Sequence, residues 1–142
     1  MYYGKKSRKK SQLTSGNSRS DERAIVQAGR LMGGHKFSPD HSLSIDVLSQ
    51  MASSLKRGVL FCPNPNTDID KLVAMSSCLN PGVIFHPHPY TDSDKLVAMS
   101  SSLKGGIIFN SHPTIDKEKL IAMSSNLNRG VFFIPDPDTC ID

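Results

Sequence analysis

Residues 58–81 read GVLFCPNPNTDIDKLVAMSSCLNP, and the next two blocks of equal length repeat this pattern without an insertion. Residues 82–105 read GVIFHPHPYTDSDKLVAMSSSLKG, and residues 106–129 read GIIFNSHPTIDKEKLIAMSSNLNR. The leading glycines recur every 24 residues, and the same step reaches Gly34 before these blocks and Gly130 after them. An ungapped repeat is typical of a solenoid, in which each unit packs on its neighbours.

Five units of this length divide the chain after residue 19. They span residues 20–43, 44–67, 68–91, 92–115 and 116–139, with a truncated end at 140–142. Within a unit, the spacing of Leu72, Met75 and Leu79 forms the apolar stripe of an amphipathic helix. A Ser or Asp precedes each predicted helix as its N-cap: Ser20, Ser44, Asp68, Asp92 and Asp116. The glycine that follows each helix is expected to stop it.

A short apolar strand follows each predicted helix, as in residues 59–61 and 83–85. Because one helix and one strand alternate in every unit, all strands must run in the same direction. The sequence therefore predicts an α/β fold, a short βα solenoid with a parallel sheet on one face and helices on the other. The period is too short for a two-helix repeat, which needs about 34 residues.

The chain from residue 20 to residue 142 resembles the leucine-rich repeat family, most closely its ribonuclease-inhibitor-like class found in many bacterial proteins. The matching positions lie in the strand, in the turn, before the helix and along the helix: Val59, Phe61, Asn64, Asp68, Leu72, Met75 and Leu79. The strands depart from the family by carrying Val, Ile and Phe instead of Leu. The family Asn position also varies, reading Asp40, Asn64, His88, His112 and Asp136. The resemblance implies a leucine-rich-repeat-like solenoid that recognises proteins without catalysis, and similar arrays occur in effectors that bacteria deliver into host cells.

Equivalent residues of successive units stack, because the period is fixed. One row is Cys62, His86 and Asn110, which has the residue types of a cysteine-nucleophile triad. Stacked side chains on a flat sheet point in parallel, however, and no oxyanion hole is evident, so we expect no enzyme activity. Another row holds His88 and His112, but zinc requires three or four ligands in tetrahedral directions. We therefore expect neither a metal ion nor another cofactor, and interpret these two histidines as turn residues.

Alternate residues of a strand point to opposite faces of the sheet. Val59 and Phe61 are predicted to face the helices, which places an apolar row on the open face: Leu60, Ile84, Ile108 and Phe132. Beside this row stand Cys62, His86 and Asn110. An exposed apolar row is typical of a binding surface, so we predict a protein partner or self-association here or at the C-terminal edge strand. The alternative is that the N-terminal segment or a second copy covers the strands on this side.

The positive charge of the chain gathers at its N-terminal end. Residues 1–34 hold eight Lys or Arg against two acidic residues, whereas the remaining residues hold nine against eleven. Residues 1–19 are rich in Lys, Ser and Gly without apolar periodicity, so we predict a disordered basic tail. Its basic cluster comprises Lys5, Lys6, Arg8, Lys9 and Lys10. This cluster provides the alternative function: contact with nucleic-acid phosphates or an acidic membrane surface, or a nuclear address.

The tail also lacks the apolar segment of a usual secretory signal, and no stretch reaches the roughly 18 apolar residues of a membrane span. Three cysteines in such a chain indicate reduced thiols. We therefore predict an intracellular location, which is the cytoplasm, or the nucleus of a host cell if the protein is delivered there.

Overall fold

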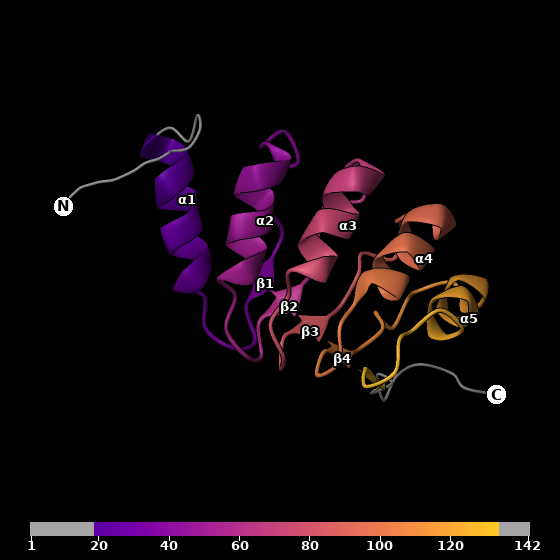
Figure 1. The fold of residues 1–142 in the computed structure, drawn as a ribbon. Coiled ribbons are helices and arrows are strands. Elements are labelled where there is room, and N and C mark those ends of the chain that lie inside the picture. The colour runs from indigo at the N-terminus through magenta and orange to yellow at the C-terminus, as the bar shows by residue number, and fades with distance from the viewer. Residues whose placement is uncertain (1–18, 134–142) are drawn as a thin grey trace.

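The computed structural model describes residues 19–133, in which helices and strands alternate along the chain (Figure 1). The helices are α1 (Arg19–Gly29), α2 (Ile45–Ser53), α3 (Ile69–Ser77), α4 (Ser93–Ser102) and α5 (Lys117–Ser124). The strands are β1 (Lys36–Phe37), β2 (Leu60–Phe61), β3 (Ile84–Phe85), β4 (Ile108–Phe109) and β5 (Phe132–Phe133). The predicted unit of one helix and one strand is therefore confirmed.

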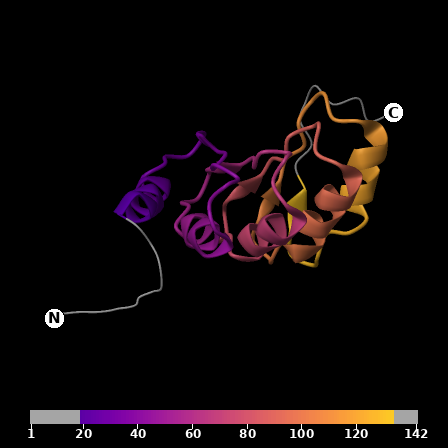
Figure 2. The ribbon, with the colours of Figure 1, turned by 90° about the horizontal axis from the view of Figure 1, so that it is seen from above.

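The strands form one five-stranded parallel sheet in the order β1-β2-β3-β4-β5. Their register advances by one unit at each step, so that Leu60 pairs with Ile84 and Ile84 pairs with Ile108. Neighbouring helices contact one another in chain order and fan out on one side of the sheet (Figure 1 and Figure 2). The fold is thus the predicted α/β solenoid, with a parallel sheet on one face and helices on the other.

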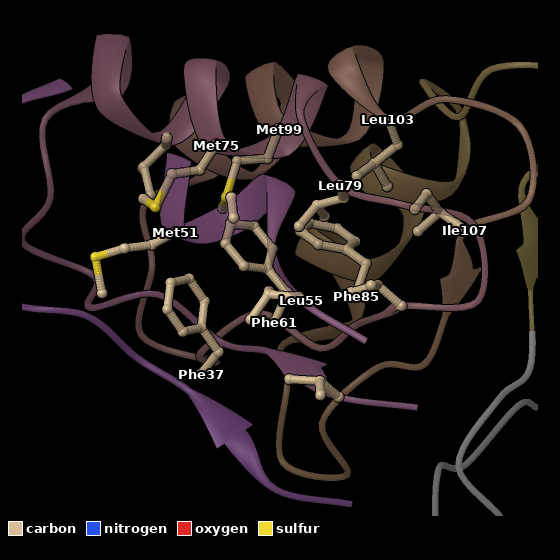
Figure 3. Packing of buried hydrophobic residues seen from close by; sticks show 14 of the residues in the cluster. Phe37, Met51, Leu55, Phe61, Met75, Leu79, Phe85, Met99, Leu103 and Ile107 are labelled. Carbon is tan, nitrogen blue, oxygen red and sulfur yellow. The ribbon is translucent and has the colours of Figure 1, made fainter. Parts of the chain in front are cut away.

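The core lies between the sheet and the helices and is built from rows of equivalent residues (Figure 3). Phe37, Phe61, Phe85 and Phe109 stack along it, with ring-centroid distances of 6.2, 6.2 and 5.6 Å between neighbours. Methionines from successive helices lie on the helix side of these rings. Val59 and Phe61 are fully buried, which confirms that these two positions face the helices.

Four helices begin after a polar residue with extended backbone, at the N-cap positions that the sequence predicts. The Ser44 hydroxyl accepts a hydrogen bond from Val47 N at 3.3 Å. Asp116, Asp68 and Asp92 hold the same position in later units, and an Asp116 carboxylate oxygen accepts from the main-chain N–H two residues ahead at 3.2 Å. Carboxylates here also favour the positive end of the helix dipole.

Helix α1 differs from this pattern. It begins at Arg19, so Ser20 lies inside the helix and the prediction of Ser20 as its N-cap is wrong. Arg19 also lies in the helix instead of the predicted tail. Asp21 and Glu22 stand in the first turn, where negative charge stabilises a helix that begins at this point.

The repeated glycines do not end the helices, contrary to the sequence prediction. Helix α3 ends at Ser77, and Gly82 lies beyond it in a separate turn. Val83 N donates to Asn80 O, which closes a four-residue turn with Pro81 and Gly82 at its centre. The φ of Gly82 is 91°, and all five repeat glycines lie between 86° and 92°. This is the third-residue conformation of a type II turn, which residues with a side chain disfavour.

The glycine turns also join successive units through main-chain hydrogen bonds. Gly58 N donates to Gly82 O at 2.8 Å, and the same bond recurs at 2.8 Å at each junction between units. The strands bond in the opposite sense, since Ile84 N donates to Val59 O of the preceding unit at 3.0 Å. Every junction is therefore held in register by donors from both sides.

Side chains reinforce the same junctions. The Nζ atoms of Lys71, Lys95 and Lys119 each donate to the main-chain oxygen 30 residues earlier, at 2.9, 3.0 and 3.1 Å. Asn80 Nδ2 donates to two main-chain oxygens at the end of α2 at 2.8 and 3.1 Å, and Asn128 Nδ2 donates to two at the end of α4, both at 2.7 Å. The asparagine bonds satisfy carbonyl groups at helix ends, which lack an intrahelical partner.

Replacing Gly82 by Ala should destabilise the fold. The added Cβ would lie 2.8 Å from Arg57 Cγ, and the positive φ is strained for any residue with a side chain. We expect the free energy of unfolding, measured by urea denaturation, to fall by about 1–3 kcal/mol. Gly105→Ala is the matched control, because its Cβ would meet nothing closer than Arg129 O at 3.7 Å. Equal stability of the two variants would contradict the turn geometry.

Candidate functional site

The apolar row, defined by Leu60, Ile84, Ile108 and Phe132, runs across the open face of β2–β5 through the strand register. The first three side chains are half-buried, whereas Phe132 is 62% exposed. Neighbours in the row cover each other's flanks, and Phe132 has a neighbour on one side only within the described strands. Only Phe132 is therefore as exposed as the sequence analysis expects.

The three residues predicted beside the apolar row lie at the ends of the strands. Cys62 is 7% exposed and His86 is 8% exposed, whereas Asn110 is half-buried. The His86 Nδ1–H donates to the main-chain oxygen of Asn110 at 2.6 Å. Cys62 and His86 thus offer a partner little surface, which differs from their predicted place in the binding surface.

The geometry of this row gives no activated thiolate. Within residues 19–133, no hydrogen bond joins Cys62 Sγ to the His86 ring, whose Nδ1–H is bound to a main-chain oxygen. Burial raises the pKa of the Cys62 thiol, against a smaller opposing effect of the Lys36 charge. An activated cysteine nucleophile requires a lowered pKa instead.

The histidines of the turns accept main-chain hydrogen bonds. His88 Nδ1 accepts from Tyr90 N at 3.1 Å, and His112 Nδ1 accepts from Thr114 N at 3.1 Å. Asn64 makes the same bond to the residue two positions ahead through its Oδ1, at 2.8 Å. The imidazole nitrogen thus takes the place of the Asn oxygen, which supports the interpretation of both histidines as turn residues.

These hydrogen bonds bear directly on metal binding. A neutral imidazole that accepts a hydrogen bond at Nδ1 carries its proton on Nε2. Zinc bound at Nδ1 of His88 or His112 would displace the hydrogen bond of the turn, and zinc bound at Nε2 would displace the ring proton. The described residues contain no group of three or more His, Cys, Asp or Glu that could hold a metal ion.

Within residues 19–133, the last unit, which contains α5 and β5, is less buried than the units before it. Leu120, Leu127 and Val131 are half-buried, whereas their equivalents one unit earlier are fully buried. Ile121 on α5 is 56% exposed. Among residues 19–133 this end is therefore an apolar surface in its own right, next to Phe132.

Sequence reasoning missed a hollow beside the apolar row. It has a volume of about 370 Å³ and is lined by Arg57, Pro81, Gly82, Gly106, Ile108 and Phe132. The available signal was Arg57, a basic side chain at the repeat position that holds Pro81 and Gly105 in the next two units. The hollow joins this cation to the exposed end of the apolar row.

The basic cluster of the predicted tail, Lys5, Lys6, Arg8, Lys9 and Lys10, lies outside the described residues. The predicted disorder of this segment stays a prediction for the same reason. None of the helices in residues 19–133 is long and apolar enough to cross a membrane.

Comparisons with known proteins identify no relative. No family model matches the chain, no curated protein matches it, and no solved structure matches it. Membership of the leucine-rich repeat family therefore stays a proposal.

Cys62 should alkylate slowly in the folded protein, because it is buried and its raised pKa leaves little thiolate at neutral pH. Its rate with iodoacetamide should keep rising above the usual thiol pKa of about 8.5, where an exposed thiol levels off. Peptide mass spectrometry after timed labelling measures this rate. The urea-unfolded chain supplies the reference, and fast labelling of Cys62 at neutral pH would show an activated thiolate.

His112→Asn should leave the free energy of unfolding nearly unchanged, because Asn64 forms the same turn bond in another unit. His112→Ala removes the acceptor of Thr114 N and should cost about 1 kcal/mol. Thermal and urea unfolding of the two variants measure the difference. A large loss in the Asn variant would mean that the ring does more than hold the turn.

Proposed function

We propose that the chain is a non-catalytic protein-interaction module of the leucine-rich repeat type, which binds a partner through the open face of its sheet. The observation that carries this proposal is the apolar row, whose last member, Phe132, is 62% exposed. Covering such a row with a partner removes apolar surface from water, which favours association.

Polar and aromatic groups that follow the strands would give the interface specificity. Asn110 is half-buried at the end of β4. Tyr90 is 79% exposed, and its ring lies 5.3 Å from the ring of His88. Tyrosine is enriched in protein interfaces, since its ring supplies apolar contact and its hydroxyl can form a hydrogen bond.

The exposed end at α5 and β5 supports self-association as a second mode of the same function. Ile121 and Phe132 are both more than half exposed there. An edge strand also carries main-chain groups that can pair with a further strand. A second copy of the chain could cover this end while the open sheet face binds a different protein.

The double variant Ile84→Asp and Ile108→Asp should remain folded and lose its partner or its dimer. Both side chains are half-buried on the open face, away from the fully buried rings of the core. We expect unchanged far-ultraviolet circular dichroism together with a loss of association in light scattering and in pull-downs with the intact chain as bait.

Ile69→Asp is the control, because Ile69 is 41% exposed at the start of α3, on a helix and not on the sheet. It should bind as the unsubstituted chain does. If the double variant unfolds instead, the apolar row belongs to the core and the proposed binding face is wrong.

A further inference from the structure

Within residues 19–133, the acidic side chains of the solenoid stand at one of its two edges, whereas the other edge carries basic side chains alone. We define the basic edge as the segments that lead from each helix to the next strand, which are residues 30–36, 54–60, 78–84, 102–108 and 126–132. These segments contain no acidic residue and six exposed basic ones: Arg30, Lys36, Lys56, Arg57, Lys104 and Arg129. Between β1 and residue 133, the acidic residues stand on the opposite edge, at or near the helix starts: Asp40, Asp46, Asp68, Asp70, Asp92, Asp94, Asp116 and Glu118.

The basic residues of the two edges also differ in their hydrogen bonds and ion pairs. On the acidic edge, Lys71, Lys95 and Lys119 are bound to main-chain oxygens of the preceding unit. On the basic edge, no ion pair joins any of the six cations to an acid within residues 19–133. Unpaired cations gathered on one edge of a repeat scaffold produce a positive potential that attracts an acidic partner.

The hollow beside the apolar row opens onto this basic edge. Its floor is main chain, because Gly82 and Gly106 have no side chains. The Arg57 side chain lies across Gly82, with Cγ 2.8 Å and Nε 2.9 Å from where a Cβ would stand, and Pro81 lies across Gly106 in the same way. Gly105 lies across Gly130 in the next unit but has no side chain. Within the described chain, the space toward Phe132 is therefore open.

We propose that this hollow binds an acidic protein segment, with a large apolar side chain seated against Ile108 and Phe132 and a carboxylate paired with Arg57. The inference rests on the proposed function, since Ile108 and Phe132 belong to the apolar row, and it specifies the chemistry of the partner. The guanidinium of Arg57 can bind a carboxylate through two parallel hydrogen bonds. Lys56, Lys104 and Arg129 would attract further acidic residues of the same segment.

A protein segment suits the lining better than a nucleic acid does. Among the described residues, the hollow is lined by Pro81, glycine main chain, two apolar side chains and one cation. Single-stranded nucleic acid is bound on several aromatic side chains that stack successive bases. Within the described lining, Phe132 is the one aromatic ring.

The test is a selection of random peptides displayed on phage against the immobilised full chain, followed by affinity measurements on the enriched peptides by fluorescence anisotropy. We expect enriched peptides to combine Asp or Glu with a large apolar residue. Arg57→Glu, the milder Arg57→Gln and Phe132→Ser should each weaken their binding by about tenfold or more. Arg23→Glu, an exposed arginine of α1 outside the basic edge, should leave the affinity unchanged, and thermal unfolding confirms that every variant is folded.

The outcomes separate this inference from the proposed function. In one outcome, the enriched peptides have no acidic bias, bind the unsubstituted chain and Arg57→Glu equally well, and do not bind the double variant Ile84→Asp with Ile108→Asp. This result would overturn the inference that the partner is acidic and would leave the proposed binding face intact. The inference is also overturned if acidic peptides bind Phe132→Ser with unchanged affinity. It is overturned as well if an oligouridylate displaces the peptides at lower concentration than unlabelled peptide does. No enrichment over the double variant would refute both proposals.

Discussion

The ladder of main-chain hydrogen bonds at the glycine turns is the constraint on which the rest of the structure depends. Gly58 N to Gly82 O, repeated at 2.8 Å at every junction, fixes each unit against the next. The geometry requires a positive φ at each repeat glycine and a close approach of the neighbouring turn. A residue inserted between a repeat glycine and the strand that follows it would break this ladder or the strand pairing.

Because the period is fixed, equivalent residues of successive units stack, and the role of one residue can be judged from the others in its row. His88 and His112 look like a ligand pair in isolation, but in their row they do what Asn64 does, accepting a main-chain N–H two residues ahead. Phe37 to Phe109 form a continuous stack because every unit places a ring at the same point. The apolar row follows from the same rule on the other face, where no helix covers the sheet in the described chain.

The solenoid, the parallel strands and four of the five N-cap positions could be predicted from the sequence, because they depend on periodicity and on the polar residue before each helix, although Asp68 and Asp92 form no side-chain capping hydrogen bond. The role of the glycines could not be predicted, since the sequence does not distinguish a glycine that ends a helix from a glycine inside a type II turn. The burial of Cys62 and His86 also escaped prediction. Strand alternation assigns each residue to a face, but exposure depends on the neighbouring unit, as where the His86 ring binds Asn110 O and lies 5.5 Å from the His112 ring.

Helix electrostatics explains one edge of the solenoid and leaves the other unexplained. Acidic residues such as Asp70 and Asp94 stand in the first turns of their helices, where the helix dipole stabilises negative charge. The same dipole would favour basic residues in the last turns, yet none of the five helices has one there. Lys56 and Arg57 lie beyond the end of α2, past the turn within which the dipole acts. Helix stability therefore does not account for these two positions. Arg57 packs across Gly82, and the proposed acidic partner would account for its charge.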